Sequence, residues 1–167
     1  SIPLPSKLDL RLVVGKLYWY DYQFDGLDVR LNGKPDDLSI RLDNWQLADG
    51  RLSGLLNWKA HATGHQLRGS MSGKQLDISK LFKSFHNFDQ DFLTGEHLSG
   101  KLDVKMSMLM PFDKDFNLIS RQMELIADLD LQQGGLRNFE PMNGLSRFVD
   151  AKELQDLRFQ RLTNHIE

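Results

Sequence analysis

Two segments of the chain hold residue types that could do chemistry, and each departs from the pattern that the chemistry requires. Residues 113–117, Asp-Lys-Asp-Phe-Asn, begin like a calcium-binding loop with Glu124 at its twelfth position. The sixth position needs the sharp turn that glycine allows, but it is Leu118, and Arg121 at the ninth position would repel the ion. Residues 69–74 resemble a phosphate loop, but only three residues lie between the two glycines, and a phosphate loop has four residues there.

The histidines and the absence of cysteine also argue against a metal site or a nucleophile. His61 and His65 have the spacing of a metal pair on a helix, yet Thr63-Gly64 between them predicts a surface turn joining two strands. The chain has no cysteine, which excludes disulfides, thiolate metal sites and a cysteine nucleophile. We therefore expect a protein that is not an enzyme and that holds no metal and no cofactor. A pair of scattered carboxylates meeting in the fold is the remaining enzymatic alternative.

Composition limits the class of protein further. The 167 residues suit one domain covering 1–167, and 40% apolar residues suffice for a core. The formal net charge is -2, and no two basic residues are adjacent. Because phosphate contacts supply most of the affinity of nucleic-acid binders, this balance disfavours nucleic acid as a partner.

Apolar and polar residues alternate with period two along most of the chain, which predicts strands with one buried face. The first 75 residues are predicted to form about six strands, with turn signals at 32–37, Asp49-Gly50 and Thr63-Gly64, and Gly15 suggests a bulge or bend. Long strands are expected over 98–108 and 123–131, with a turn at 133–135 and a closing strand near 157–166.

Two segments have helical periodicity instead. Asp77 can cap a helix over 78–86, whose apolar residues fall on one face, and Pro141 can open a second helix that continues towards Leu154. The predicted fold is mostly β with two or three short helices: a curved antiparallel sheet, or β-groove, whose apolar face is partly covered by helices.

The functional hypothesis rests on the apolar faces of the predicted strands. Eight or nine such strands present more apolar surface than two short helices cover, so the sheet is expected to curl or to leave a hydrophobic concavity. Gap filling in a core is the commoner role of a methionine run such as Met106, Met108 and Met110; the alternative is a surface that accepts varied apolar partners. The apolar residues expected to line this concavity and to contact its ligand are Leu98, Leu102, Val104, Met106, Met108, Met123, Leu125, Ala127 and Leu129.

The chain also resembles a known family. The residues that carry the resemblance are 98–103 (Leu-Ser-Gly-Lys-Leu-Asp), 134–136 (Gly-Gly-Leu), 139–141 (Phe-Glu-Pro) and 157–159 (Leu-Arg-Phe), together with Asp49-Gly50-Arg51-Leu52-Ser53-Gly54 in the first half. They are similar to the C-terminal region of AsmA-family proteins in the form typical of Bacteroidota. That family is related to the bridge-like lipid transport proteins of the envelope.

The resemblance implies a membrane-anchored periplasmic protein whose β-groove takes part in lipid transport or outer-membrane biogenesis. Residues 1–167 would be an excised part of it, with the membrane anchor outside this sequence. The expected partner is a phospholipid or another acyl-chain lipid, with other envelope proteins as further partners. The alternative function is a sheet scaffold that binds proteins, or assists outer-membrane protein assembly, by strand addition.

Overall fold

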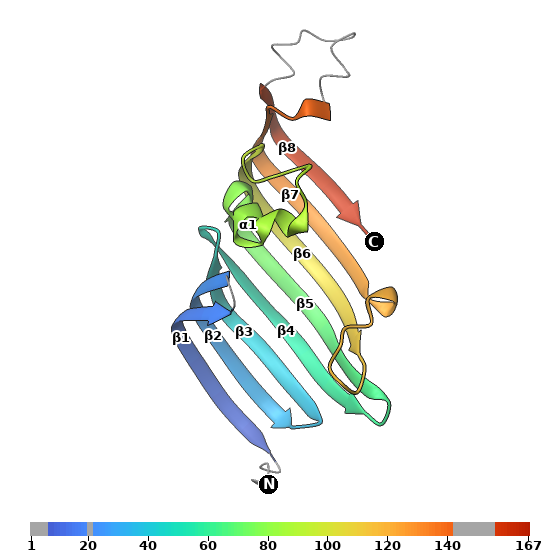
Figure 1. Ribbon diagram of the computed structural model, residues 1–167. Helices are drawn as coiled ribbons and strands as arrows, with labels where there is room; N and C mark the ends of the chain where they lie inside the picture. Colours follow the sequence, from blue (N-terminus) through green and yellow to red (C-terminus); the bar gives the residue numbers. More distant parts are fainter. Residues whose placement is uncertain (1–6, 20–21, 142–155) are drawn as a thin grey trace.

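The computed structural model describes residues 7–19, 22–141 and 156–167, and they form one open sheet of eight antiparallel strands in chain order (Figure 1). Each strand pairs with the next along the chain, so short hairpin connections build most of the sheet. The mostly β, curved antiparallel fold expected from the sequence is thus confirmed. The strands are β1 (Leu8–Trp19), β2 (Tyr22–Lys34), β3 (Asp37–Leu47), β4 (Gly50–His61), β5 (Gly64–Asp77), β6 (Leu98–Phe112), β7 (Glu124–Arg137) and β8 (Asp156–Ile166).

Strand boundaries differ from the prediction at three places. The first 77 residues hold five long strands rather than about six. The register of β1 with β2 is uninterrupted across Gly15, so the predicted bulge there is wrong, and the irregularity lies between Asp25 and Val29 on the β2–β3 side. Gly134 and Gly135 lie inside β7 and not in a turn.

The helical parts are short. α1 (Ile78–Ser84) begins where the Asp77 carboxylate accepts a hydrogen bond of 3.1 Å from the Lys80 amide, as the capping prediction required. Two 3-10 turns follow, η1 (His86–Asp89) and η2 (Ser120–Gln122). The helix predicted after Pro141 lies outside the described residues. None of the helices described has the length and apolar content that crossing a bilayer requires.

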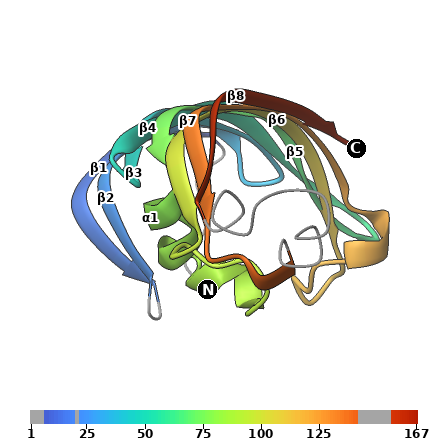
Figure 2. The same ribbon diagram turned by 90° about the horizontal axis from the view of Figure 1, so that it is seen from above.

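The sheet is strongly curved, and α1 lies on its inner side (Figure 2). Three glycines at the centre of the sheet permit close approach of the chain. A Cβ on Gly54 would lie 2.7 Å from the Ser70 carbonyl oxygen, and one on Gly69 would lie 2.7 Å from the Leu56 Cα. On Gly73 it would lie 2.7 Å from the Val104 side chain. Side chains at these positions would force the neighbouring strands apart and flatten the bend.

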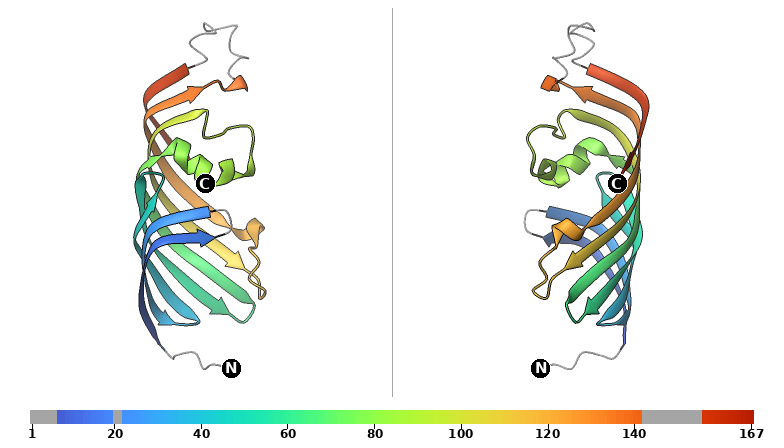
Figure 3. Two further views of the ribbon diagram at one scale, coloured as in Figure 1. Left: turned by 60° about the vertical axis from the view of Figure 1, so that its left-hand side comes forward. Right: turned by 90° about the vertical axis from the view of Figure 1, so that its right-hand side faces the viewer.

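The core lies between α1 and the strands beneath it. Leu76, at the end of β5, is the most buried large side chain at 1% exposure. Around it pack Leu52, Leu102 and Leu131 from three other strands, and α1 contributes Ile78, Leu81 and Phe85. The helix therefore occupies one end of the sheet, and the connector between β6 and β7 lies at the other end (Figure 3).

Candidate functional site on the helix-side face

Cross-strand register defines the residues that share the side of the sheet on which α1 packs, here called the helix-side face. Residues directly paired across antiparallel strands point to the same face. One row of paired positions crosses all eight strands, and every member is apolar or glycine. Its members are Leu12, Val29, Leu42, Gly54, Met71, Met106, Ala127 and Ile166.

A second row lies nearer the end of the sheet that α1 does not cover, and it is equally apolar. Leu10 and Leu125 at its two ends are 45% and 39% exposed, and Met108 in the middle is half-buried. Side chains of this kind contact solvent without a polar group that could bind water. The row runs through Leu10, Leu31, Ile40, Leu56, Gly69, Met108 and Leu125.

The structure divides the nine predicted lipid-facing residues into two groups. Leu102, Val104 and Ala127 are 7%, 5% and 6% exposed, so neighbouring protein atoms already surround them. The half-buried Met106 and Leu129 pack against the same core. These five positions belong to the covered end of the face, and sequence periodicity alone did not distinguish them from open positions.

The other four predicted residues are more accessible. Met108 and Leu125 are direct cross-strand partners in the second row. Met123 is 43% exposed but precedes β7, at the end of the η2 turn. Leu98 is half-buried and is separated from the rest of β6 by a register shift between Ser99 and Lys101. Met108 and Leu125 are therefore the two predicted residues that best represent an open apolar surface.

An aromatic cluster lies at the uncovered end of the helix-side face. The His65 ring is stacked on Phe116 at 4.3 Å and on Trp58 at 5.1 Å between ring centroids. His65 pairs with Ala60, which places the adjacent His61 on the opposite face, so the two histidines do not form a metal pair. Within the described residues, no group of three or more histidines and carboxylates is arranged to hold a metal.

The calcium-like segment forms a tight loop whose first carboxylate is used internally. Asp113 accepts hydrogen bonds of 2.8 Å from the Asp115 amide and 2.9 Å from the Asn117 amide. The Asn117 side chain donates a further bond of 3.0 Å and is the main cause that lowers the pKa of Asp113. Asp113 therefore organises the backbone of this connector.

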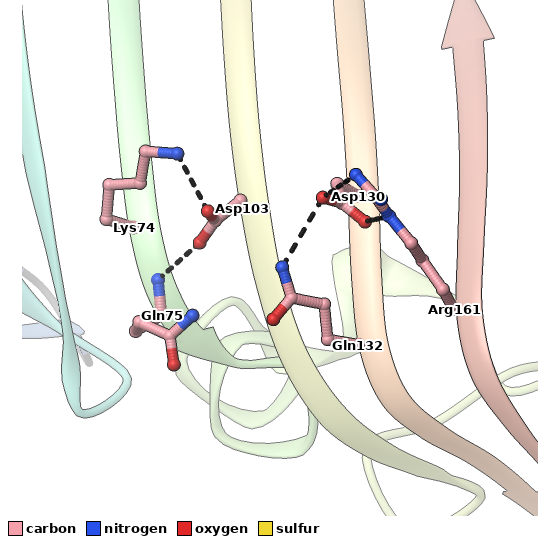
Figure 4. Close-up of polar contacts among 6 residues, drawn as sticks. All are labelled: Lys74, Gln75, Asp103, Asp130, Gln132 and Arg161. Carbon is pink, nitrogen blue, oxygen red and sulfur yellow. Dashed lines mark hydrogen bonds and ion pairs between the residues drawn. The ribbon is translucent and has the colours of Figure 1, made fainter.

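The opposite, outer face of the sheet is crossed by ion pairs between neighbouring strands (Figure 4). Arg161 donates two hydrogen bonds of 2.8 Å to Asp130, and Lys74 donates one of 2.7 Å to Asp103. Both carboxyl pKa values are lowered, chiefly by these bonds. The outer face thus carries ion pairs between strands beside exposed apolar side chains such as Leu55 and Ile126, whereas every position of the two rows on the helix-side face is apolar or glycine.

Asp103 has a second role, because it satisfies the backbone of a bulge. The register of β5 with β6 shifts between Gly73 and Leu76, and Gln75 adopts a φ of 55° there. The Gln75 amide, which the bulge removes from regular strand pairing, donates a 2.8 Å hydrogen bond to the Asp103 carboxylate. The bulge and its carboxylate partner immediately precede Leu76, and so help to set the direction in which the chain enters the core.

Replacing Asp103 by asparagine is expected to lower the free energy of unfolding by about 1 kcal/mol at pH 7, because the carboxylate charge that pairs with Lys74 and accepts from the Gln75 amide is lost. The lowered pKa of Asp103 means that its contribution is present above the ordinary value of 3.8 and is lost as the pH falls through the folded-state value. The stability difference between wild type and variant should therefore shrink with acid. Urea unfolding at pH 7 and pH 3 measures this, and an equal difference at both pH values would contradict it.

A hollow of about 1180 Å³ lies at the α1 end, beside the β3–β4 turn. Its lining is charged and largely paired: Lys80 contacts Asp49 at 2.6 Å, and Asp43 contacts Arg30 at 2.8 Å. Cations and carboxylates there neutralise one another. The two apolar rows of the helix-side face contrast with this charged lining.

Comparison of the chain with family models, with curated proteins and with solved structures found no match.

Proposed function

We propose that the helix-side face is an apolar groove that holds the acyl chains of a lipid at the end of the sheet that α1 leaves uncovered. The observation that carries this proposal is the second row, in which every position is apolar or glycine and both end members are exposed. An acyl chain requires no hydrogen-bond partner, so such a row suits it without further polar groups. Transfer of each methylene from water contributes about 0.8 kcal/mol.

Three methionines make this surface adaptable to acyl chains of different shape. Met106, Met108 and Met110 lie at alternate positions of β6 and share one face of that strand. Their side chains are unbranched and polarisable, and they adapt to ligands of different length and unsaturation. The half-buried state of all three is consistent with side chains that contact one another now and a ligand when it is bound.

In this proposal the module performs no catalysis. Its resemblance to AsmA-family proteins supports a periplasmic location, a membrane anchor outside this sequence, and a part in lipid transport or outer-membrane biogenesis. The curved sheet with one helix at its inner side is the form such a groove would take. The polar outer face would then be the side in contact with water.

Replacing Met108 by aspartate is expected to weaken lipid binding about tenfold, because a charge in the second row must be desolvated when an acyl chain covers it. The adjacent Ser107 lies on the outer face and is exposed, so Ser107→Asp is the matched control. Titration with a fluorescent phospholipid measures both variants, and native mass spectrometry of protein purified from cells reports bound lipid. Equal affinity of the two variants, or no lipid bound to wild type, would remove the proposal.

A second candidate function is supported by the edges of the sheet. β1 has 12 residues and β8 has 11, and among the described residues each pairs with a neighbouring strand on one side only. Such edges can accept a strand from a partner protein. A partner of this kind would slow amide hydrogen exchange in β1 or β8, whereas bound lipid would leave those amides exchanging fast.

A further inference from the structure

We propose that the connector between β6 and β7, residues 113–123, is a contact tip that inserts into the surface of a lipid bilayer. This inference rests on the proposed function and adds to it the place where an acyl chain enters the groove. Phe116 and Leu118 would be the inserted side chains. The tip would bring the open end of the helix-side face to the membrane.

The connector exposes large apolar side chains close together. Phe116 is 63% exposed, Leu118 is 42% exposed, and Met123 is 43% exposed. A group of this kind on a polar surface marks an interaction site. Because the group stands on a loop between two strand ends, it suits penetration into a soft apolar layer better than packing into a rigid pocket.

The loop holds its exposed phenylalanine in a fixed position. Phe116 has a φ of 64°, a left-handed conformation that a bulky residue rarely adopts. Hydrogen bonds to Asp113 from Asp115 and Asn117, and one of 3.0 Å from the Asp113 amide to the Asn117 carbonyl oxygen, maintain it. This conformation places the Phe116 ring on His65 and Trp58, at 4.3 and 6.1 Å between ring centroids, while 63% of the residue stays exposed beyond the stack.

The tip is continuous with the open end of the proposed groove. Phe112 at the end of β6 forms a bridge with Leu118, and Met108 and Leu125 face each other a few residues away. In Figures 1 and 3 the connector lies at the end of the sheet opposite to α1. An acyl chain leaving a bilayer at the tip would therefore meet the uncovered apolar row and not the filled core.

Charge distinguishes this tip from the other group of exposed phenylalanines. Residues 86–97 expose Phe88 and Phe92, but they contain three carboxylates and no lysine or arginine. The connector 113–123 holds two cations, Lys114 and Arg121, and two carboxylates, Asp113 and Asp115, so its formal charge is zero where the three carboxylates of residues 86–97 are unopposed by lysine or arginine. Cations favour approach to phosphate groups and carboxylates oppose it, so the bilayer should be contacted at the connector.

The cysteine-free chain allows a direct test with single labels. Phe116→Cys and Phe92→Cys are each labelled with an environment-sensitive fluorophore and mixed with vesicles of three parts phosphatidylcholine and one part phosphatidylglycerol. The proposal expects a blue shift and a severalfold increase in intensity at position 116, with little change at position 92. No change at 116, or an equal change at 92, would overturn it.

A second pair of measurements uses unlabelled protein, so that the fluorophore cannot affect the result. It also distinguishes failure of this inference from failure of the proposed function. Unlabelled Phe116→Ser/Leu118→Ser should lose most vesicle co-sedimentation while it still binds a fluorescent phospholipid presented singly in solution. Unchanged co-sedimentation overturns the tip and leaves the groove standing. Loss of single-lipid binding by this variant and by Met108→Asp alike would show that Phe116 and Leu118 belong to the groove itself and are not a separate bilayer contact, and would also overturn the tip.

Discussion

Shortening Leu76 to alanine is expected to lower the free energy of unfolding by about 3 kcal/mol, at the middle of the range for buried leucines. Leu76 is 1% exposed and touches strands and α1 at once, so the vacated volume cannot be filled by a small adjustment. The same substitution at Leu125, on the same face of the sheet, should cost less than about 1 kcal/mol because that side chain is 39% exposed.

Chemical unfolding followed by circular dichroism measures both variants. The contrast between them tests whether the helix-side face is filled at the α1 end and open at the other. Costs of similar size at Leu76 and Leu125 would mean that the second row is as tightly packed as the core. The acyl-binding proposal would then lose its physical basis.

Replacing Gly69 by valine is expected to lower the free energy of unfolding by about 3 kcal/mol, at the upper end of the range for overpacked positions. A Cβ at Gly69 would lie within contact distance of the Leu55 carbonyl oxygen and 2.7 Å from the Leu56 Cα, so β4 and β5 would have to separate. Separation at the centre of the sheet would reduce the curvature that makes the helix-side face concave.

The neighbouring Ser70 provides a matched control. It is exposed on the outer face, where a branched side chain suits a strand, and Ser70→Val should change stability by no more than about 0.5 kcal/mol. Urea unfolding compares the two, and small-angle scattering reports whether the sheet opens. A Gly69 variant as stable as wild type would show that the glycines are not needed for the bend.

Much of the fold could be predicted from sequence because period-two alternation depends on the backbone alone. Strands at Leu8, Leu98 and Asp156 follow from it, and Asp77 marked the start of α1. Bulges do not leave such a signal: nothing in the alternation showed that β7 continues through Gly134 and Gly135 with a register shift against β6, or that the register of β5 shifts near Gln75. A bulge depends on contacts with the neighbouring strand, which one sequence does not display.

The candidate site was also predicted only in part, because alternation shows which face a residue is on but not what covers that face. Alternation placed Met108 and Leu125 on an apolar face, but it could not distinguish them from Leu102 and Val104, which α1 and its neighbours bury. That difference depends on where a helix of seven residues comes to lie on a sheet of eight strands. The exposure of Phe116 was not predicted, because the position of an aromatic residue in a connector is set by the loop conformation and leaves no period in the sequence.

The most direct test of the central claim is the methyl NMR spectrum of the protein in the presence of a spin-labelled fatty acid. Isotope-labelled methionine methyl groups report on Met106, Met108 and Met110, and the Ile126 methyl groups report on the outer face, where that side chain is 46% exposed. The account predicts strong broadening of Met108 and Met110 and little broadening of Ile126. Equal broadening on both faces, or none at the methionines, would contradict an acyl-binding groove.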